Sequence, residues 1–183
     1  MLTSDKIILK KVEKEDLETL RNWRNEPSLR KYFREHKDIS KTDQENWYQN
    51  KVLNNPNQYN FSIFADNKLI GHCGLYYINW ISRSAEFGIY LGDFNYRNGG
   101  YGSDALKTLI KYGFEDLNLN RIWCEVYKNN KALDIYKHLG FKYEGTLRST
   151  YYNEGQYWDS DILGMLKKEY EKKYRRCLYS SSS

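Results

Sequence analysis

A glycine-rich segment between a predicted strand and a predicted helix constrains this fold more than any other part of the sequence. The strand at residues 85–91 is followed closely by Arg97-Asn98-Gly99-Gly100-Tyr101-Gly102. Residues 99–117 then carry apolar side chains at helical spacing, and residues 121–127 are rich in strand-forming residues. Strand, glycine loop, helix and strand in this order predict a βαβ unit.

The glycine loop has the properties of an anion site. Unpaired N–H groups at a helix N-terminus, together with the helix dipole, favour negative charge. Glycines let the backbone approach a phosphate closely, and Arg97 adds a donor suited to phosphate oxygens. We therefore expect a phosphate or pyrophosphate to be held by Arg97, Asn98, Gly99, Gly100, Tyr101, Gly102 and Ser103.

The loop letters admit more than one phosphate-bearing cofactor. A P-loop is excluded, because no Lys-Ser or Lys-Thr follows the glycines at the required spacing. Residues 100–105 do match the dinucleotide fingerprint G-x-G-x-x-A, and Glu125 follows at about the spacing of a ribose-binding acid. A dinucleotide domain usually continues into a second βαβ half, whereas this chain continues into a short helix and a hairpin. The loop alone leaves that alternative open.

The remaining periodicities predict one domain, residues 1–170, with a basic and Ser-rich tail at 171–183. The sequence indicates an α/β (α+β) fold with a mixed sheet flanked by helices. Gly140 is expected to end the last of these helices. Helices are predicted at residues 14–25, 40–52, 99–117 and 129–139, and strands at 7–12, 59–65, 68–78, 85–91, 121–127, 141–147 and 156–166.

Composition narrows the function classes. The net charge of +5 is mild, and the basic stretch 167–176 is interrupted by Glu169 and Glu171, so a nucleic-acid partner is not expected. Apolar runs are too short to span a membrane. The three cysteines, Cys73, Cys124 and Cys177, are widely spaced, which fits reduced thiols in the cytoplasm and predicts no metal site.

Two motifs together resemble the GNAT superfamily of acyltransferases. Arg97, Gly100 and Gly102 match the superfamily's R/Q-x-x-G-x-G/A loop. Asn129-x-x-Ala132-x-x-x-Tyr136-x-x-x-Gly140-Phe141 is similar to its last-helix signature, and the resemblance runs from residue 7 to about residue 166. It implies a mostly antiparallel central sheet and acetyl-CoA as cofactor, with the loop gripping the pyrophosphate. It also implies that the backbones of Ile89 and Leu91 pair with the pantetheine arm, and that Asn129 reaches the arm from the other side.

The expected reaction is direct attack of a primary amine on the thioester in a ternary complex. An amine with a pKa of about 10 must first lose a proton. Strand alternation places Glu86 on the same strand face as Gly88 and Tyr90. Because this strand is expected to line the cofactor cleft, Glu86 is the candidate base; an exposed or salt-bridged strand acid is the alternative. Tyr136 is the candidate acid for the leaving thiolate, a role that the resemblance supports, and core packing is its alternative.

The acceptor is less well defined by the sequence. Residues 20–25 and 40–47 resemble the subgroup that acetylates nucleotide-linked amino sugars, which would make Arg24 and Asn25 acceptor contacts, although helix capping also explains Asn25. Residues 155–159 are shared with ribosomal-protein N-terminal and polyamine acetyltransferases. We expect the amino sugar, with those two acceptors as alternatives. A non-catalytic acyl-CoA sensor or a nucleic-acid-binding module is the alternative of a different class. Relatives of this kind often form homodimers.

Overall fold

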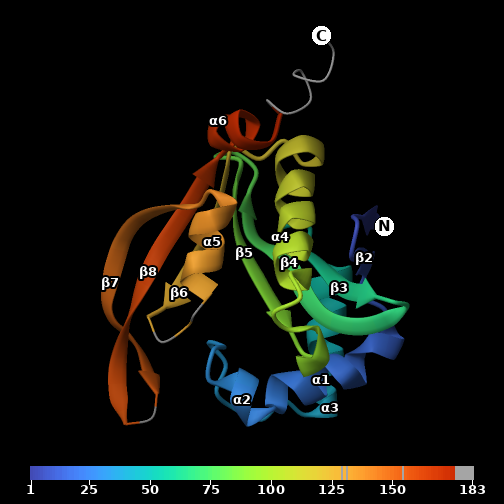
Figure 1. Cartoon of the computed structure of the whole chain (residues 1–183). Coiled ribbons are helices and arrows are strands. Elements are labelled where there is room, and N and C mark those ends of the chain that lie inside the picture. Colours follow the sequence, from blue (N-terminus) through green and yellow to red (C-terminus); the bar gives the residue numbers. More distant parts are fainter. Residues whose placement is uncertain (129, 131, 154, 176–183) are drawn as a thin grey trace. The chain divides into compact units, whose positions relative to one another are not determined.

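The computed structural model describes residues 1–128, 130, 132–153 and 155–175 (Figure 1). The chain forms two compact units: Met1–Tyr77 with Phe87–Leu109, and Ile78–Glu86 with the residues from Ile110 onward. In the described residues, no helix is long and apolar enough to cross a membrane.

The first unit is built on antiparallel strands. Its hydrogen-bonded order is β1-β2-β3-β4-β5, and the pairs β1–β2, β2–β3 and β3–β4 are antiparallel. A tight turn joins β3 to β4, with Asp66 and Asn67 both at positive φ. The strands are β1 (Leu2–Thr3), β2 (Ile8–Lys11), β3 (Tyr59–Ala65), β4 (Lys68–Asn79) and β5 (Ser84–Leu91), of which β4 and β5 continue into the second unit.

Short helices complete the first unit. A 3₁₀ turn (Lys14–Asp16) leads into α1 (Leu17–Asn25), and α2 (Pro27–Arg30) begins at a proline, which suits a first helical position. Helix α3 (Lys41–Trp47) starts at a capping box, where Ser40 Oγ accepts from Asp43 N–H at 3.0 Å, and continues as a π-helical turn (Tyr48–Leu53). Helix α4 (Tyr101–Lys111) follows the glycine loop. Buried Val12, Leu17, Leu20 and Tyr48 form a core beneath α1 and α3.

The second unit has the strand order β5-β6-β8-β7, to which β5 contributes its first residues. Ser84–Glu86 of β5 run parallel to β6 (Arg121–Tyr127), whereas β6–β8 and β7–β8 are antiparallel. Strands β7 (Lys142–Asn153) and β8 (Gln156–Leu166) form the long hairpin in Figure 1. The helical segments are the turn Tyr112–Asp116 that continues α4, α5 (Ala132–Leu139), α6 (Lys167–Tyr170) and the turn Glu171–Arg175.

The predicted mixed sheet with one βαβ unit is confirmed. Strands at 59–65, 121–127 and 156–166 have the predicted bounds, and the apolar stripe from Ala105 to Phe114 is buried. One prediction was wrong: residues 148–153 were expected in a loop but extend β7. They pair with β8 through Tyr151 and Trp158, after an irregularity that includes Ser149 at φ +52°. The short β1 and α2 were also missed.

Candidate active site

The glycine loop lies in the first unit and begins where β5 ends. A 3₁₀ turn, Phe94–Tyr96, follows the strand and is capped by Asp93, whose carboxylate accepts from Asn95 N–H at 3.0 Å. Asn98 and Gly100 both have positive φ, at +63° and +81°. Because L-residues with a side chain rarely adopt this conformation, the chain can turn into α4 here at low cost only with residues such as Asn and Gly.

Neither packing nor backbone conformation requires a glycine at residue 102. A Cβ placed on it would lie 3.6 Å from Leu91 Cδ1, an ordinary van der Waals contact, and its φ is not positive. Gly99 differs, because a Cβ there would lie 2.7 Å from the Tyr101 ring. Bare backbone in the first turn of α4 leaves room for a group to approach the helix N–H donors. The residues of this loop therefore fit the pyrophosphate of coenzyme A.

Arg97 carries positive charge at the start of the loop. Its guanidinium Nη2 donates to the Leu91 carbonyl at 3.2 Å, and its Cζ lies 3.9 Å from the centroid of the Phe94 ring. The side chain is half-buried, and it links the loop to the end of β5. This geometry fixes the guanidinium beside the loop, next to the residues expected to bind phosphate.

Ile89 and Leu91 are the predicted partners of the pantetheine arm. The parallel ladder joins Ser84–Glu86 of β5 to Arg121–Trp123 of β6. Strand β5 then runs on to Leu91, so the backbones of Ile89 and Leu91 lie outside that ladder. Asn129, expected on the other side of the arm, lies outside the described residues.

Tyr136 lies in the second unit on α5, where the helix ends in a Schellman motif. Gly140 has φ +104°; its N–H donates to Lys137 C=O at 3.0 Å, and Phe141 N–H donates to Tyr136 C=O at 3.1 Å. The Tyr136 and Phe141 rings pack edge to face with centroids 6.4 Å apart. The predicted glycine cap is confirmed, and it holds the backbone and ring of the candidate acid in place.

The surroundings of Tyr136 keep its hydroxyl protonated. Desolvation is the main cause that raises its pKa, and Cys124 adds to it. Cys124, on β6, is buried; burial and then the charge of Glu86 raise the pKa of its thiol, so it stays neutral. Glu86 is itself 7% exposed. Within the second unit, the Cys124 thiol therefore interacts electrostatically with both the candidate acid and the candidate base.

The two predicted acceptor residues have different surroundings in the first unit. Asn25 is a structural clamp: its Nδ2 donates to Ile39 C=O at 2.9 Å, and its Oδ1 accepts from Ile39 N–H at 2.8 Å. These bonds tie the end of α1 to the segment before α3. The predicted helix cap is replaced by this longer-range role, in which both Nδ2 and Oδ1 of Asn25 bond to the Ile39 backbone.

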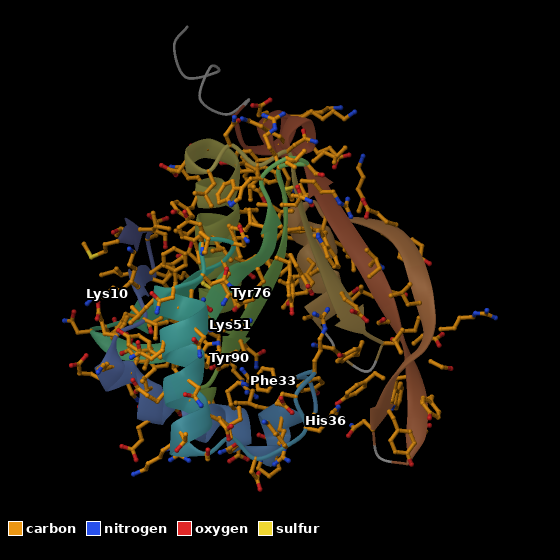
Figure 2. All side chains as sticks on the ribbon, turned by 180° about the vertical axis from the view of Figure 1, so that it is seen from behind. Lys10, Phe33, His36, Lys51, Tyr76 and Tyr90 are labelled. Carbon is orange, nitrogen blue, oxygen red and sulfur yellow. The ribbon has the colours of Figure 1, made fainter. Side chains whose placement is uncertain are left out.

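Arg24 belongs to a half-buried aromatic cluster that includes the buried His72. Its Cζ lies 4.8 Å from the centroid of the Phe33 ring, and Phe33 packs on Tyr90 at 5.0 Å (Figure 2). Tyr90 also lies 5.7 Å from His72, which contacts Trp47 at the same separation. Within the part of the chain that the structure describes, Arg24 Nε and His72 Nε2 are buried without hydrogen-bond partners. Burial, with help from Arg24, lowers the pKa of His72 to about 3, so this imidazole is neutral at pH 7.

The late hairpin contains one core stack and one polar network. Tyr151 is buried, and its ring stacks on Tyr127 with centroids 4.0 Å apart. Ser160 Oγ donates to Glu125 Oε1 at 2.5 Å. Glu125, the acid that a dinucleotide fingerprint would place on a ribose, is thus part of the hairpin network. Among the described residues, no group of His, Cys, Asp and Glu is arranged to hold a metal ion.

Comparison with known proteins decides the family. The family described as "Acetyltransferase (GNAT) domain" matches residues 6–142 of the chain. This chain belongs to the GNAT acetyltransferase family. Its glycine loop, α4 and α5 all lie within the matched residues.

Full-length relatives and solved structures agree with this assignment. An uncharacterized N-acetyltransferase, p20, of Bacillus licheniformis is 31% identical, over 92% of this chain and 97% of the relative. Spermidine N(1)-acetyltransferase of Escherichia coli K12 is 29% identical, over 93% and 91%. The Vibrio cholerae spermidine N-acetyltransferase in complex with CoA and spermine superposes with a TM-score of 0.84 at 29% identity, covering 91% of this chain and 99% of that one. A dodecameric structure of the Vibrio cholerae enzyme has a TM-score of 0.80. The chain is an acetyl-CoA-dependent N-acetyltransferase.

Proposed function

We propose that this GNAT enzyme acetylates a polyamine of the spermidine type by direct attack of a primary amine on acetyl-CoA in a ternary complex. The observation that carries the proposal is the near full-length match to a structure solved with CoA and spermine. Curated spermidine N-acetyltransferases of Escherichia coli and Vibrio cholerae support it. The comparisons therefore favour a polyamine over the nucleotide-linked amino sugar that we expected from residues 20–25.

In the proposed reaction, the cofactor supplies a thioester and its pyrophosphate is gripped by the glycine loop. Backbone N–H groups of Gly100 to Ser103 would face the phosphates, with Arg97 adding charge at the strand end. The geometry that supports this is the positive φ of Gly100 and the Cβ position of Gly102, where a methyl group would meet Leu91 only at ordinary contact distance. The backbones of Ile89 and Leu91 are the proposed partners of the pantetheine arm.

Tyr136 is proposed to give a proton to the leaving thiolate. A raised pKa keeps the phenol protonated across neutral pH, which is the state that a general acid needs. The same desolvation would make a thiolate there more basic, so transfer from phenol to sulfur is not opposed by the raised pKa. A Tyr136→Phe enzyme should lose kcat while keeping its affinity for acetyl-CoA, because the ring and its packing on Phe141 remain. Equal losses in both would assign Tyr136 to packing.

Glu86 is proposed to accept the amine proton, directly or through water. Its support is its burial and its electrostatic interaction with Cys124, which also interacts with Tyr136. A Glu86→Gln enzyme should lose the acidic limb of the pH profile of kcat/KM. A profile unchanged from that of the wild type would remove Glu86 from the mechanism.

A nucleotide-linked amino sugar is the second candidate acceptor, because the Arg24 cluster is cationic and aromatic. Arg24 Nε is a buried donor with no partner among the described residues, and Phe33 and Tyr90 offer flat apolar surface beside it. A phosphate-bearing acceptor would be attracted by this charge and a polycation repelled. Arg24→Gln should raise KM for a nucleotide sugar, but leave unchanged or lower KM for spermidine.

An acceptor panel tests the proposal. Purified enzyme and acetyl-CoA are incubated with spermidine, spermine, a nucleotide-linked amino sugar or an N-terminal peptide, and the products are identified by mass spectrometry. We expect acetylated spermidine or spermine at the highest kcat/KM. Turnover restricted to the nucleotide sugar would establish the second candidate, and turnover of the peptide alone would overturn both.

Self-association is proposed as well, because the Vibrio cholerae relative has a dodecameric structure. The resemblance to relatives that often form homodimers implies a dimer, which stays a prediction. Light scattering on the purified chain separates monomer, dimer and dodecamer, and a monomer at all concentrations would refute self-association.

A further inference from the structure

The N-terminal segment of the chain contacts the start of α4 and the glycine loop. Ser4 Oγ donates to Asp104 Oδ2 at 2.5 Å, and Lys6 N–H donates to the same oxygen at 3.1 Å. Lys6 Nζ donates to Gly99 C=O at 2.8 Å. These bonds join residues 93 to 100 positions apart in the sequence. All of them lie within the first unit.

The bond from Lys6 Nζ orients one peptide of the loop. The described peptides are all trans, so the C=O of Gly99 and the N–H of Gly100 point in opposite directions. Holding Gly99 C=O on the side of Lys6 therefore turns Gly100 N–H to the other side. Gly100 itself has φ +81°, and Lys6 Nζ lies 3.3 Å from where its Cβ would stand. The ammonium group thus lies beside the position that a side chain at residue 100 would occupy.

The same N-terminal segment binds the carboxylate of Asp104 in the first turn of α4. Asp104 lies three residues into the helix, where a carboxylate would compete with a cofactor phosphate for the helix N–H donors. Its Oδ2 is instead occupied by Ser4 Oγ and Lys6 N–H. The Lys6 ammonium, bound to Gly99 C=O, also adds a positive charge beside the loop. Both effects favour an anion at the loop.

We propose that Lys6 is a positioning residue for acetyl-CoA, which presets the Gly99–Gly100 peptide and adds a positive charge beside the loop so that the loop receives the pyrophosphate. The inference rests on the proposed grip of the pyrophosphate by this loop. Lys6 acts through the loop and does not touch the thioester or the amine. Its effect should appear in cofactor affinity and be absent from the chemical step.

Lys6→Met tests the proposal because it keeps the aliphatic stem and removes the charge and the donors. We expect Kd for coenzyme A, measured by calorimetry, and KM for acetyl-CoA to rise about tenfold, with kcat at saturating substrates unchanged; a tenfold change equals about 1.4 kcal/mol. S-acetylpantetheine lacks the pyrophosphate, so its KM should be the same in the wild type and the variant. Lys6→Arg should restore most of the affinity.

Lys10→Met is the matched control. Lys10 is on the neighbouring strand β2, where its Nζ lies 4.5 Å from the centroid of the Phe64 ring (Figure 2). The Lys10→Met substitution therefore removes the same charge as Lys6→Met, away from the loop. We expect its coenzyme A affinity to equal that of the wild type. Unchanged coenzyme A binding in Lys6→Met, or an equal rise of KM for S-acetylpantetheine, would overturn the role of Lys6. Failure of the wild type to prefer acetyl-CoA over S-acetylpantetheine would instead overturn the grip of the loop on the pyrophosphate.

Discussion

Replacing Gly102 with alanine should stabilise the protein and weaken its hold on coenzyme A. Alanine is better than glycine in a helix by up to about 1 kcal/mol, and in the first turn we take about half of that. The new Cβ meets Leu91 at 3.6 Å, so packing adds no penalty. For a domain of this size, the melting temperature of the free protein should rise by about 1–2 °C.

The same Cβ would stand where the proposed phosphate approaches the backbone. Loss of one hydrogen bond to a charged group costs about 1.5–3 kcal/mol, which corresponds to about ten- to a hundredfold weaker binding. Calorimetric titration with coenzyme A and thermal melts of the free protein measure the two effects separately. Coenzyme A affinity equal to that of the wild type would refute the close approach of backbone and phosphate at residue 102.

Two other glycines serve as controls for this experiment. Gly100→Ala must place a side chain at φ +81°, which costs about 1–2 kcal/mol and should lower the melting temperature. Gly145, on β7, has open space around its Cβ position and no positive φ, so Gly145→Ala should change neither stability nor affinity by much. Opposite signs of the stability change at residues 100 and 102 are therefore expected.

Gly140→Ala should destabilise the chain by about 1–2 kcal/mol, because φ is +104° and a Cβ would meet Lys173 Cδ at 2.9 Å; urea melts measure the loss, and an unchanged midpoint would contradict the Schellman cap. Asn25→Ala should cost about 1–3 kcal/mol by leaving the Ile39 backbone unpaired, whereas a raised acceptor KM at unchanged stability would make Asn25 an acceptor contact. His72 makes stability depend on pH: the unfolded chain takes up a proton near pH 6.5 that the folded chain refuses until about pH 3, so stability is complete above pH 6.5 and falls below it. At pH 4.5 the loss should be about 2–3 kcal/mol, and urea melts of His72→Leu should lack this part of the acid dependence.

The sequence predicted those elements whose signal is local. The strand 121–127, the helix that follows the glycine loop and the helix cap at Gly140 are each encoded by residues close together in the sequence, and the structure contains all three. Residues 148–153 were misassigned because Arg148-Ser149-Thr150 has the composition of a loop. Their strand conformation depends on pairing with β8 and on the stack of Tyr151 against Tyr127, which no local pattern encodes.

In the candidate site, too, the residues in local motifs could be predicted from the sequence, whereas the long-range contacts could not. The loop motif and the Tyr136 motif are short runs of sequence, so their elements could be located in advance. The clamp from Asn25 to Ile39 could not, because it joins segments fourteen residues apart, and the role of Asn25 as an acceptor contact stays a prediction. Lys6 gave no signal, because only the turn between β1 and β2 brings it to a loop more than ninety residues away.

The most direct test of acetyl transfer is the rate of free-thiol release from acetyl-CoA with and without spermidine. We predict slow release from acetyl-CoA alone, a large and saturable increase on addition of spermidine, and loss of most of that increase in Tyr136→Phe. Tight binding of acetyl-CoA with no release that depends on any amine would contradict the assignment of this chain as an enzyme of acetyl transfer, and would make it a sensor of acetyl-CoA.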